Sequence, residues 1–174
     1  MKGFFNRILS INVSSLNYKV EPIDDELLEK YLGGKGLSTH LLLKYNPPRV
    51  DQLSPDNHLI LSTGPFSGTP IWGSCRYGIY TKSPQTGFYS ESYSGGTVAE
   101  YMARTGFDVT MIHGASRDPI WIEISDKDVF FHDAKGLWGL DTFETEDCTK
   151  AWIRETRPDD QICPFYRLGY VQGV

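Results

Sequence analysis

The sequence of 174 residues predicts an α+β fold with a mixed or antiparallel sheet and a few flanking helices. Segments with strand-like alternation outnumber segments with helical spacing, and short turns typical of hairpins separate most neighbouring strand candidates. No fixed-period repeat is present. The length and the 40% hydrophobic content suit a single domain over residues 1–174 with a substantial core.

The first half of the chain predicts an antiparallel hairpin of residues 5–13 and 17–21, followed by a helix that Asp24 or Asp25 caps. Gly-Gly-Lys-Gly at residues 33–36 interrupts this helix, and helical spacing resumes over residues 37–45. The Gly-Gly-Lys-Gly segment could place Lys35 and bare backbone near a phosphate, or it could be a helix break at a close backbone crossing. It lacks the Gly-Lys-Ser/Thr ending of a phosphate-binding P-loop and the strand before it, so we favour the helix break.

The second half predicts a helix between Gly96 and Gly106, and a last helix that Thr142 opens and Arg157-Pro158 stops. Short apolar or alternating runs bounded by turn residues indicate six further strands. These strands are expected at residues 58–61, 76–81, 88–93, 109–112, 119–124 and 129–132.

Residues 62–96 form a stretch rich in Gly, Ser and Pro that carries Arg76 and ends in Ser-Tyr-Ser-Gly-Gly before a predicted helix. Glycine lets backbone approach a ligand closely, and the free N–H groups of a helix start favour an anion. The same composition is also typical of a series of β-turns. From the residues alone, both interpretations stay open.

The composition argues against several classes of function. The net charge of -5 and the scattered Lys and Arg residues make nucleic acid an unexpected partner. No apolar run approaches the roughly 18 residues of a membrane span, and the chain start lacks a signal-peptide core, so we expect a cytoplasmic protein without membrane contact.

Residues with catalytic or metal-binding chemistry form no recognisable constellation. Three cysteines at unrelated spacings can build neither a disulfide framework nor a complete zinc or iron–sulfur site, and each is expected to be small and partly buried. Only Cys75, beside Arg76, is a candidate for reactivity. The histidines at positions 40, 58, 113 and 132 lack ligand spacing. No catalytic residue can be named from the residues alone.

Several motifs together resemble the N-terminal domain of the tungsten-containing aldehyde ferredoxin oxidoreductases. Their order and spacing cover about the first 160 residues: YLGGKGL (31–37), STGP (62–65), GSCRY (73–77), TKSPQTG (81–87), SYSGG (92–96) and LWGLDTFET (137–145). The resemblance implies an α+β domain whose large mixed sheet forms a base for the cofactor. That cofactor is tungsten or molybdenum held by two molybdopterins with a bridging magnesium, beside a 4Fe-4S cluster.

The resemblance also implies the activity and the site residues. Family enzymes oxidise aldehydes to carboxylic acids and pass the electrons to ferredoxin. Arg76 matches the arginine between one pterin and the cluster, and Tyr93, Ser94 and Gly95 match the loop that meets pterin phosphate and magnesium. Where the family usually has Asn, this chain has Tyr93, which suits a loop that offers magnesium its main-chain carbonyl.

The end of the chain departs from the family pattern. After Ile162-Cys163-Pro164, residues 165–174 do not resemble the family's I-G-P-A-G-E segment, and we expect the C-terminal domains with the cluster ligands to be absent. We therefore expect an inactive fragment or split subunit that needs a cysteine-rich partner chain or the missing domains. The alternatives are a self-associating module without catalysis, in keeping with a homo-oligomer, and a carrier of pterin phosphate.

Overall fold

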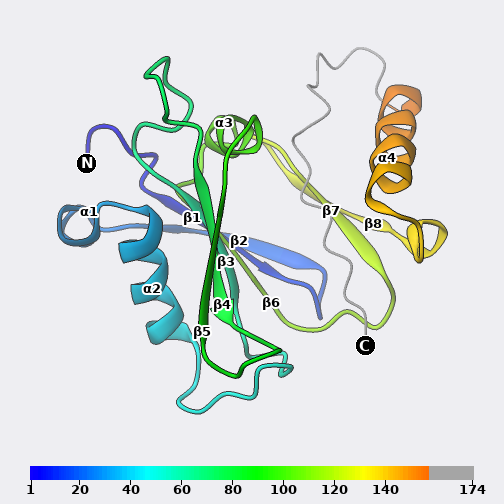
Figure 1. The fold of residues 1–174 in the computed structure, drawn as a ribbon, viewed down its shortest axis with the longest axis horizontal. Helices are drawn as coiled ribbons and strands as arrows, with labels where there is room; N and C mark the ends of the chain where they lie inside the picture. The colour runs from blue at the N-terminus through cyan, green and yellow to red at the C-terminus, as the bar shows by residue number, and fades with distance from the viewer. Residues whose placement is uncertain (157–174) are drawn as a thin grey trace. The chain divides into compact units, whose positions relative to one another are not determined.

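The computed structural model describes residues 1–156, and the chain divides into two compact units, Met1–Ser116 and Arg117–Val174 (Figure 1). The division into units does not decide whether residues 1–174 form a single domain, which stays a prediction. The two units together contain four α-helices and eight β-strands within the described residues. In this part of the chain, no helix combines the length and the apolar character needed to cross a bilayer.

The first unit is built on a six-stranded sheet with the order β2-β1-β6-β3-β4-β5. Parallel pairing occurs between β1 and β6, and all other neighbours are antiparallel, so the sheet is mixed. The expected α+β class is confirmed. The strands are β1 (Arg7–Asn12), β2 (Asn17–Pro22), β3 (Leu59–Thr63), β4 (Tyr77–Lys82), β5 (Tyr89–Ser94) and β6 (Val109–His113).

The predicted N-terminal hairpin is confirmed, with a shorter first strand than expected. β1 and β2 pair from Arg7 opposite Pro22 to Asn12 opposite Asn17. The Asn12 side chain closes the turn, because its Oδ1 accepts hydrogen bonds from the backbone N–H groups of Ser14 at 2.9 Å and Ser15 at 3.2 Å.

The helix break lies earlier than the sequence predicts. α1 (Asp25–Tyr31) ends at Leu32, and α2 (Gly34–Tyr45) begins immediately after Gly33, whose φ of 92° redirects the chain. The Gly34-Lys35-Gly36 segment is therefore the first turn of α2, not an interruption before it. Gly36 is needed there because a Cβ at this position would stand 2.6 Å from the Tyr31 carbonyl oxygen.

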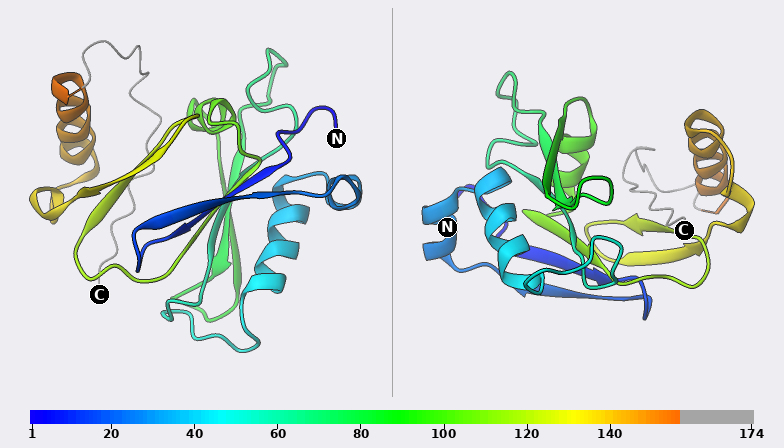
Figure 2. Two further views of the ribbon diagram at one scale, coloured as in Figure 1. Left: turned by 180° about the vertical axis from the view of Figure 1, so that it is seen from behind. Right: turned by 60° about the horizontal axis from the view of Figure 1, so that its bottom comes forward.

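The core of the first unit lies between the sheet and the helices α1 and α2. Alternate residues of the strands face this layer, and α2 lies along β3 and β4 (Figure 2). Full burial of a large aliphatic side chain contributes about 1.5–3 kcal/mol, so this layer supplies much of the unit's stability. Its buried members include Ile8, Ile60, Tyr80, Val109 and Met111 from the sheet and Leu28, Leu37 and Leu41 from the helices.

The predicted helix between Gly96 and Gly106 is confirmed as α3 (Val98–Arg104), which contacts β3. Gly106, with φ at 75°, leads the chain toward β6. Asp108 then ties β6 to the N-terminal segment, because its carboxylate accepts hydrogen bonds from the backbone N–H groups of Phe5 at 3.1 Å and Arg7 at 3.3 Å.

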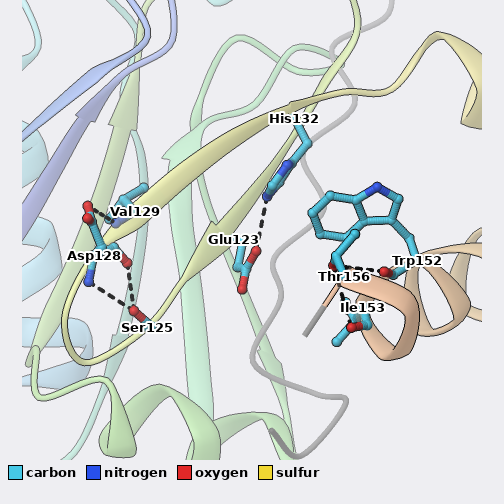
Figure 3. Close-up of polar contacts among 8 residues, drawn as sticks. All are labelled: Glu123, Ser125, Asp128, Val129, His132, Trp152, Ile153 and Thr156. Atoms are coloured by element: carbon cyan, nitrogen blue, oxygen red, sulfur yellow. Dashed lines mark hydrogen bonds and ion pairs between the residues drawn. The ribbon is translucent and has the colours of Figure 1, made fainter. Parts of the chain in front are cut away.

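The second unit consists of the hairpin β7 (Ile120–Ile124) and β8 (Val129–Asp133), the 3-10 turn η1 (Lys135–Leu137) and α4 (Thr142–Thr156). The predicted hairpin is confirmed. Its turn is closed by the Ser125 hydroxyl, which accepts from the N–H of Asp128 at 2.9 Å and donates to its carbonyl at 2.9 Å (Figure 3).

The last helix begins where the sequence predicts, with Asp141 as its capping side chain. Asp141 Oδ1 accepts hydrogen bonds from the N–H groups of Phe143 and Glu144, both at 2.8 Å. The predicted stop at Arg157-Pro158 and the departure over residues 165–174 lie outside the described residues.

Candidate functional site

Arg76 and Gly95 lie against each other at one end of the β4–β5 hairpin. The pairing of Tyr77 with Ser94 brings the residues that flank the hairpin together. A Cβ built on Gly95 would stand 3.4 Å from Arg76 Nη1 and 3.5 Å from the Cys75 carbonyl oxygen. A methyl group at Gly95 would thus be in ordinary van der Waals contact with the guanidinium, so Gly95 and Arg76 are direct neighbours.

The Arg76 guanidinium is exposed, and within residues 1–156 no ion pair includes it. Its backbone is held by the preceding loop: the Ser67 hydroxyl lies 3.2 Å from the Ser74 carbonyl oxygen and 3.4 Å from that of Arg76. A fixed backbone with an uncommitted guanidinium is an arrangement that can receive an anion.

The loop of residues 64–76 presents apolar side chains to solvent. Trp72 is fully exposed, and Phe66 and Ile71 are more than half exposed. Residues 69–75 line an open pocket of about 430 Å³. Cys75 in this loop and Cys148 in α4 are both exposed, so the expectation that they are partly buried is wrong; Cys163 lies outside the described residues.

Tyr93 faces the α2 side of the sheet, as Tyr89 and Glu91 do. In β5 it pairs with Gly78, and its ring meets the Tyr80 ring edge-on with centroids 6.0 Å apart. Burial raises the pKa of the Tyr80 hydroxyl above its usual range, and the neighbouring Tyr93 hydroxyl raises it further. Ser94 is exposed one residue later, where the strand ends.

Lys35 and Glu91 form an ion pair that the sequence analysis did not identify. Lys35 Nζ lies 2.8 Å from Glu91 Oε1, and Tyr89 OH donates to Glu91 Oε2 at 3.1 Å. The Lys35 contact lowers the pKa of Glu91 and raises that of Lys35. Period-two alternation over the predicted strand 88–93 places residues 89, 91 and 93 on one face, but nothing local points to Lys35 as their partner.

Besides the Lys35–Glu91 pair, hydrogen bonds between hydroxyl groups join α2 to the sheet. The Thr39 hydroxyl lies 2.8 Å from Tyr89 OH, and the buried hydroxyls of Ser38 and Ser62 are 2.7 Å apart. Ser62 Oγ also lies 3.2 Å from the Gly34 carbonyl oxygen, as a donor to it. The Gly-Gly-Lys-Gly segment is therefore held directly over strands β3 and β5.

The helix start after Gly96 is a weaker anion site than the sequence suggests. α3 spans only the seven residues Val98–Arg104, and Glu100 adds a carboxylate to its first turn. The macrodipole of so short a helix is small, and a negative side chain opposes an anion. The charge of Arg76 therefore attracts an anion more strongly than this helix start does.

The histidines of the first unit take part in ring stacking. His58 and His113 stack with centroids 4.9 Å apart, and His40 stacks on Tyr31 at 4.7 Å. Among the described residues, no three His, Cys, Asp or Glu side chains gather in a group that could hold a metal ion. Direct side-chain ligands for a metal are therefore not assembled in this part of the chain.

In the second unit, a histidine and a carboxylate lie among tryptophans. His132 Nε2 is 3.0 Å from the buried Glu123 Oε2, and the Trp152 ring approaches from α4 (Figure 3). The His132 ring stacks on Trp121 at 4.0 Å and meets Trp152 at 4.5 Å between centroids. Because the rings pack closely, this cluster resembles a small core and not an open site.

Comparison with known proteins agrees with the motifs. The family model described as "Aldehyde ferredoxin oxidoreductase, N-terminal domain" matches residues 8–161. The chain belongs to this family. The resemblance stated from the sequence is confirmed, and the six motifs that carry it all fall within the matched residues.

Relatives of this aldehyde ferredoxin oxidoreductase N-terminal domain are larger proteins. The tungsten-containing aldehyde ferredoxin oxidoreductase of Pyrococcus furiosus is 40% identical over 146 residues, which cover 84% of this chain and 24% of that protein. The enzyme of the same name from Thermococcus kodakarensis is 41% identical over 153 residues, 88% of this chain and 25% of that protein. The chain thus spans about a quarter of the length of these relatives.

A solved structure shares the fold. It is described as "Active site complex BamBC of Benzoyl Coenzyme A reductase in complex with 1,5 Dienoyl-CoA", and it superposes with a TM-score of 0.84 at 30% identity. The match covers 89% of this chain and 24% of that one. The mixed sheet with its helices is therefore an architecture that this family shares with a subunit of another reductase.

The relatives named above are tungsten-containing enzymes, which implies a tungstopterin cofactor for the family. The chemistry of the Arg76–Gly95 end of the sheet fits such a group in one respect. A guanidinium with free donors lies beside a glycine whose missing side chain leaves room for close approach. This donor set suits an anionic phosphate or an electron-rich ring.

Proposed function

We propose that this chain is the part of a tungsten-dependent oxidoreductase that receives the phosphate end of its pterin cofactor. The observation that carries the proposal is the close approach of Gly95 to Arg76, with a hypothetical Cβ 3.4 Å from Nη1. In the complete assembly, the reaction is the oxidation of an aldehyde to a carboxylic acid, with the electrons passed to ferredoxin. The tungsten–pterin group, when bound, supplies the two-electron chemistry.

Each proposed residue has a distinct role. Arg76 holds one pterin by charge-assisted hydrogen bonds from the several fixed donors of its guanidinium. Ser94 and Gly95 offer backbone and hydroxyl groups on the exposed end of β5, and Gly95 lets the ligand come close to Arg76.

Tyr93 contributes through its backbone carbonyl, which we propose as a magnesium ligand. Its side chain is engaged on the α2 face, where it contacts the Tyr80 ring and its hydroxyl affects the pKa of Glu91. A carbonyl oxygen is a suitable ligand for magnesium. The replacement of the family's usual Asn by Tyr93 is compatible with a contact that does not use the side chain.

We further propose that the 4Fe-4S cluster ligands come from a cysteine-rich partner chain or from additional domains. The three cysteines of this sequence have unrelated spacings, and neither Cys75 nor Cys148 belongs to a metal-binding group among the described residues. The chain alone is expected to be inactive, and molybdenum in place of tungsten is compatible with the same contacts.

The test is the metal and pterin content of the protein purified anaerobically from its native host with any partner chains. Wild-type material is expected to carry tungsten or molybdenum, found by elemental analysis, and pterin, found by the fluorescence of its oxidised form. Loss of one charge-assisted hydrogen-bond donor costs about 1.5–3 kcal/mol, so Arg76→Ala is expected to lower retained pterin about tenfold or more.

The matched control is Arg117→Ala, which removes another exposed arginine and should leave the pterin content unchanged. Gly95→Ala provides a second variant, because its added methyl group occupies the space beside Nη1 while the flexible Arg76 side chain can shift. Equal pterin content in wild type, Arg76→Ala and Gly95→Ala would refute the proposed site.

The exposed apolar loop supports a second candidate, a self-associating module without catalysis. Phe66, Ile71 and Trp72 expose apolar surface of a kind that usually marks an interface. Sedimentation of the purified chain distinguishes the candidates: a stable homo-oligomer without metal, pterin or partner chains favours the module, whereas a monomer that gains pterin with a cysteine-rich partner favours the oxidoreductase.

A further inference from the structure

A salt bridge joins α2 to the edge of the sheet close to the proposed cofactor loop. Lys35 lies in the first turn of α2, and Glu91 lies in β5, the last strand of the sheet order. The two residues are 56 positions apart, and their charged atoms are 2.8 Å apart. Among the described strands β5 pairs only with β4, so α2 provides its second attachment.

Both oxygens of the Glu91 carboxylate are engaged from this side. Oε1 receives Lys35 Nζ, and Oε2 accepts from Tyr89 OH at 3.1 Å. Tyr89 OH is itself 2.8 Å from the Thr39 hydroxyl of α2. The carboxylate is thus oriented by one charged and one neutral donor, and α2 touches both ends of this small network.

The exposure of the Lys35–Glu91 pair favours a local role for it over a contribution to global stability. The Lys35 side chain is 60% exposed, and exposed ion pairs add little to global stability. The first turn of α2 begins at Gly34, directly after Gly33 at the N-cap; both glycines have positive φ, and this path of the backbone brings Lys35 over β5.

The network continues along β5 to the proposed loop. Tyr93 shares a sheet face with Glu91, and its hydroxyl helps to lower the pKa of that carboxylate. The next two residues, Ser94 and Gly95, bring the backbone to Arg76. A shift of Glu91 would therefore move the strand whose end forms the loop.

We propose that Lys35 is a positioning residue for the loop of residues 93–95: its pair with Glu91 fixes β5 where the loop meets Arg76. This inference rests on the proposed function, since the loop is the phosphate-binding segment only under that proposal. Lys35 acts through Glu91 and does not itself touch the ligand.

The experiment compares four versions of the full chain by amide hydrogen exchange over residues 92–97. They are wild type, Lys35→Met, the conservative Lys35→Arg, and the charge swap Lys35→Glu with Glu91→Lys. Lys35→Met is expected to speed exchange in this segment roughly two- to fivefold, which matches the loss of an exposed ion pair. The conservative variant and the charge swap are expected to restore slow exchange.

Lys127→Met, which removes an exposed lysine of the β7–β8 turn, is the control and should leave the segment unchanged. The proposal is overturned if Lys35→Met exchanges like this control, or if exchange rises equally throughout the first unit, because that pattern reports a general loss of stability.

Binding of inorganic pyrophosphate with magnesium, followed by calorimetry, separates this inference from the proposed function. If wild type binds and Lys35→Met binds several-fold more weakly, the positioning role is supported. Equal affinity of the two proteins overturns it. If wild type does not bind the probe, the proposed phosphate site fails, and the exchange data alone decide whether Lys35 positions the loop.

Discussion

Gly78 in β4 is the position where one added methyl group should disturb the sheet most. A Cβ at Gly78 would stand 2.2 Å from the Tyr80 hydroxyl oxygen, 2.5 Å from Cζ and 2.8 Å from Cε2. Tyr80 is 1% exposed, so its ring cannot swing into solvent to make room. Gly78→Ala must therefore displace either the ring or the strand.

The size of the effect follows from two opposing contributions. Replacing a glycine by alanine at an unstrained position stabilises a protein by about 0.4–1 kcal/mol through the unfolded state. Overpacking a core costs about 1–3 kcal/mol, and three atoms of the Tyr80 side chain, its hydroxyl oxygen and two ring carbons, would lie closer to the added Cβ than real Cβ contacts do. The expected net result is a loss of about 1–2 kcal/mol in the free energy of unfolding.

Urea unfolding followed by tyrosine and tryptophan fluorescence measures this loss. Gly136→Ala is the control, because a Cβ there meets nothing within 4 Å. It should change the free energy by no more than about 0.5 kcal/mol. Tyr80→Phe in the Gly78→Ala background removes the nearest atom and should recover part of the loss, which a double-mutant cycle reports as a coupling energy.

A Gly78→Ala protein that unfolds within about 0.5 kcal/mol of wild type would refute the reasoning. Such a result would mean that the Tyr80 ring does not lie over the Gly78 backbone. Because Tyr93 pairs with Gly78, the position of its side chain would then also have to be different.

Two further predictions concern groups away from the proposed loop. Burial lowers the pKa of both His58 and His113, with Lys19 adding to the effect on His113, so the unfolded state binds protons more readily. The two histidines therefore contribute their full stabilisation above about pH 6.5, the pKa of histidine in the unfolded chain, and this stabilisation is lost as the pH falls through their lower pKa values in the folded protein. The urea midpoint is expected to decrease from neutral to acidic pH, and a constant midpoint would contradict this prediction. Asp108→Ala leaves the N–H groups of Phe5 and Arg7 without their acceptor and should lower the free energy of unfolding by about 1–3 kcal/mol. Asp108→Asn keeps one acceptor oxygen and should lower it less. Equal urea midpoints for the two variants would exclude Asp108 as the acceptor that holds the N-terminal segment.

Local sequence patterns were sufficient to predict most of the elements. The hairpins β1–β2 and β7–β8 follow from alternation and turn residues, which act over short distances. The parallel pairing of β1 with β6 joins residues about a hundred positions apart, and no local pattern specifies it. Likewise, the contact of Lys35 in the first turn of α2 with Glu91 in β5 joins residues 56 positions apart, and no local pattern specifies it.

The candidate site was predicted only in part, and that part came from the family resemblance. Arg76 and the loop of residues 93–95 were named through the family resemblance, and the structure brings Arg76 and Gly95 together; their binding role stays a proposal. The Lys35–Glu91 pair was missed because its lysine belongs to a glycine segment interpreted as a backbone crossing. Alternation identifies the strand face of Glu91, but a partner 56 residues away requires the fold.

Three glycines of the first unit, at positions 36, 78 and 95, have different roles, which composition alone cannot separate. Gly36 and Gly78 are required by packing, because a Cβ would stand 2.6 Å from the Tyr31 carbonyl oxygen and 2.2 Å from the Tyr80 hydroxyl oxygen. Gly95 has only ordinary contacts, and its nearest neighbour is the end of an exposed, flexible side chain. Alanine at Gly36 or Gly78 should therefore act on folding, whereas alanine at Gly95 should act on what Arg76 can bind. Because an alanine methyl group at Gly95 would be in ordinary van der Waals contact with Arg76 and the Cys75 carbonyl oxygen, Gly95→Ala tests the proposed role of Arg76 without the packing clash expected at Gly36 and Gly78.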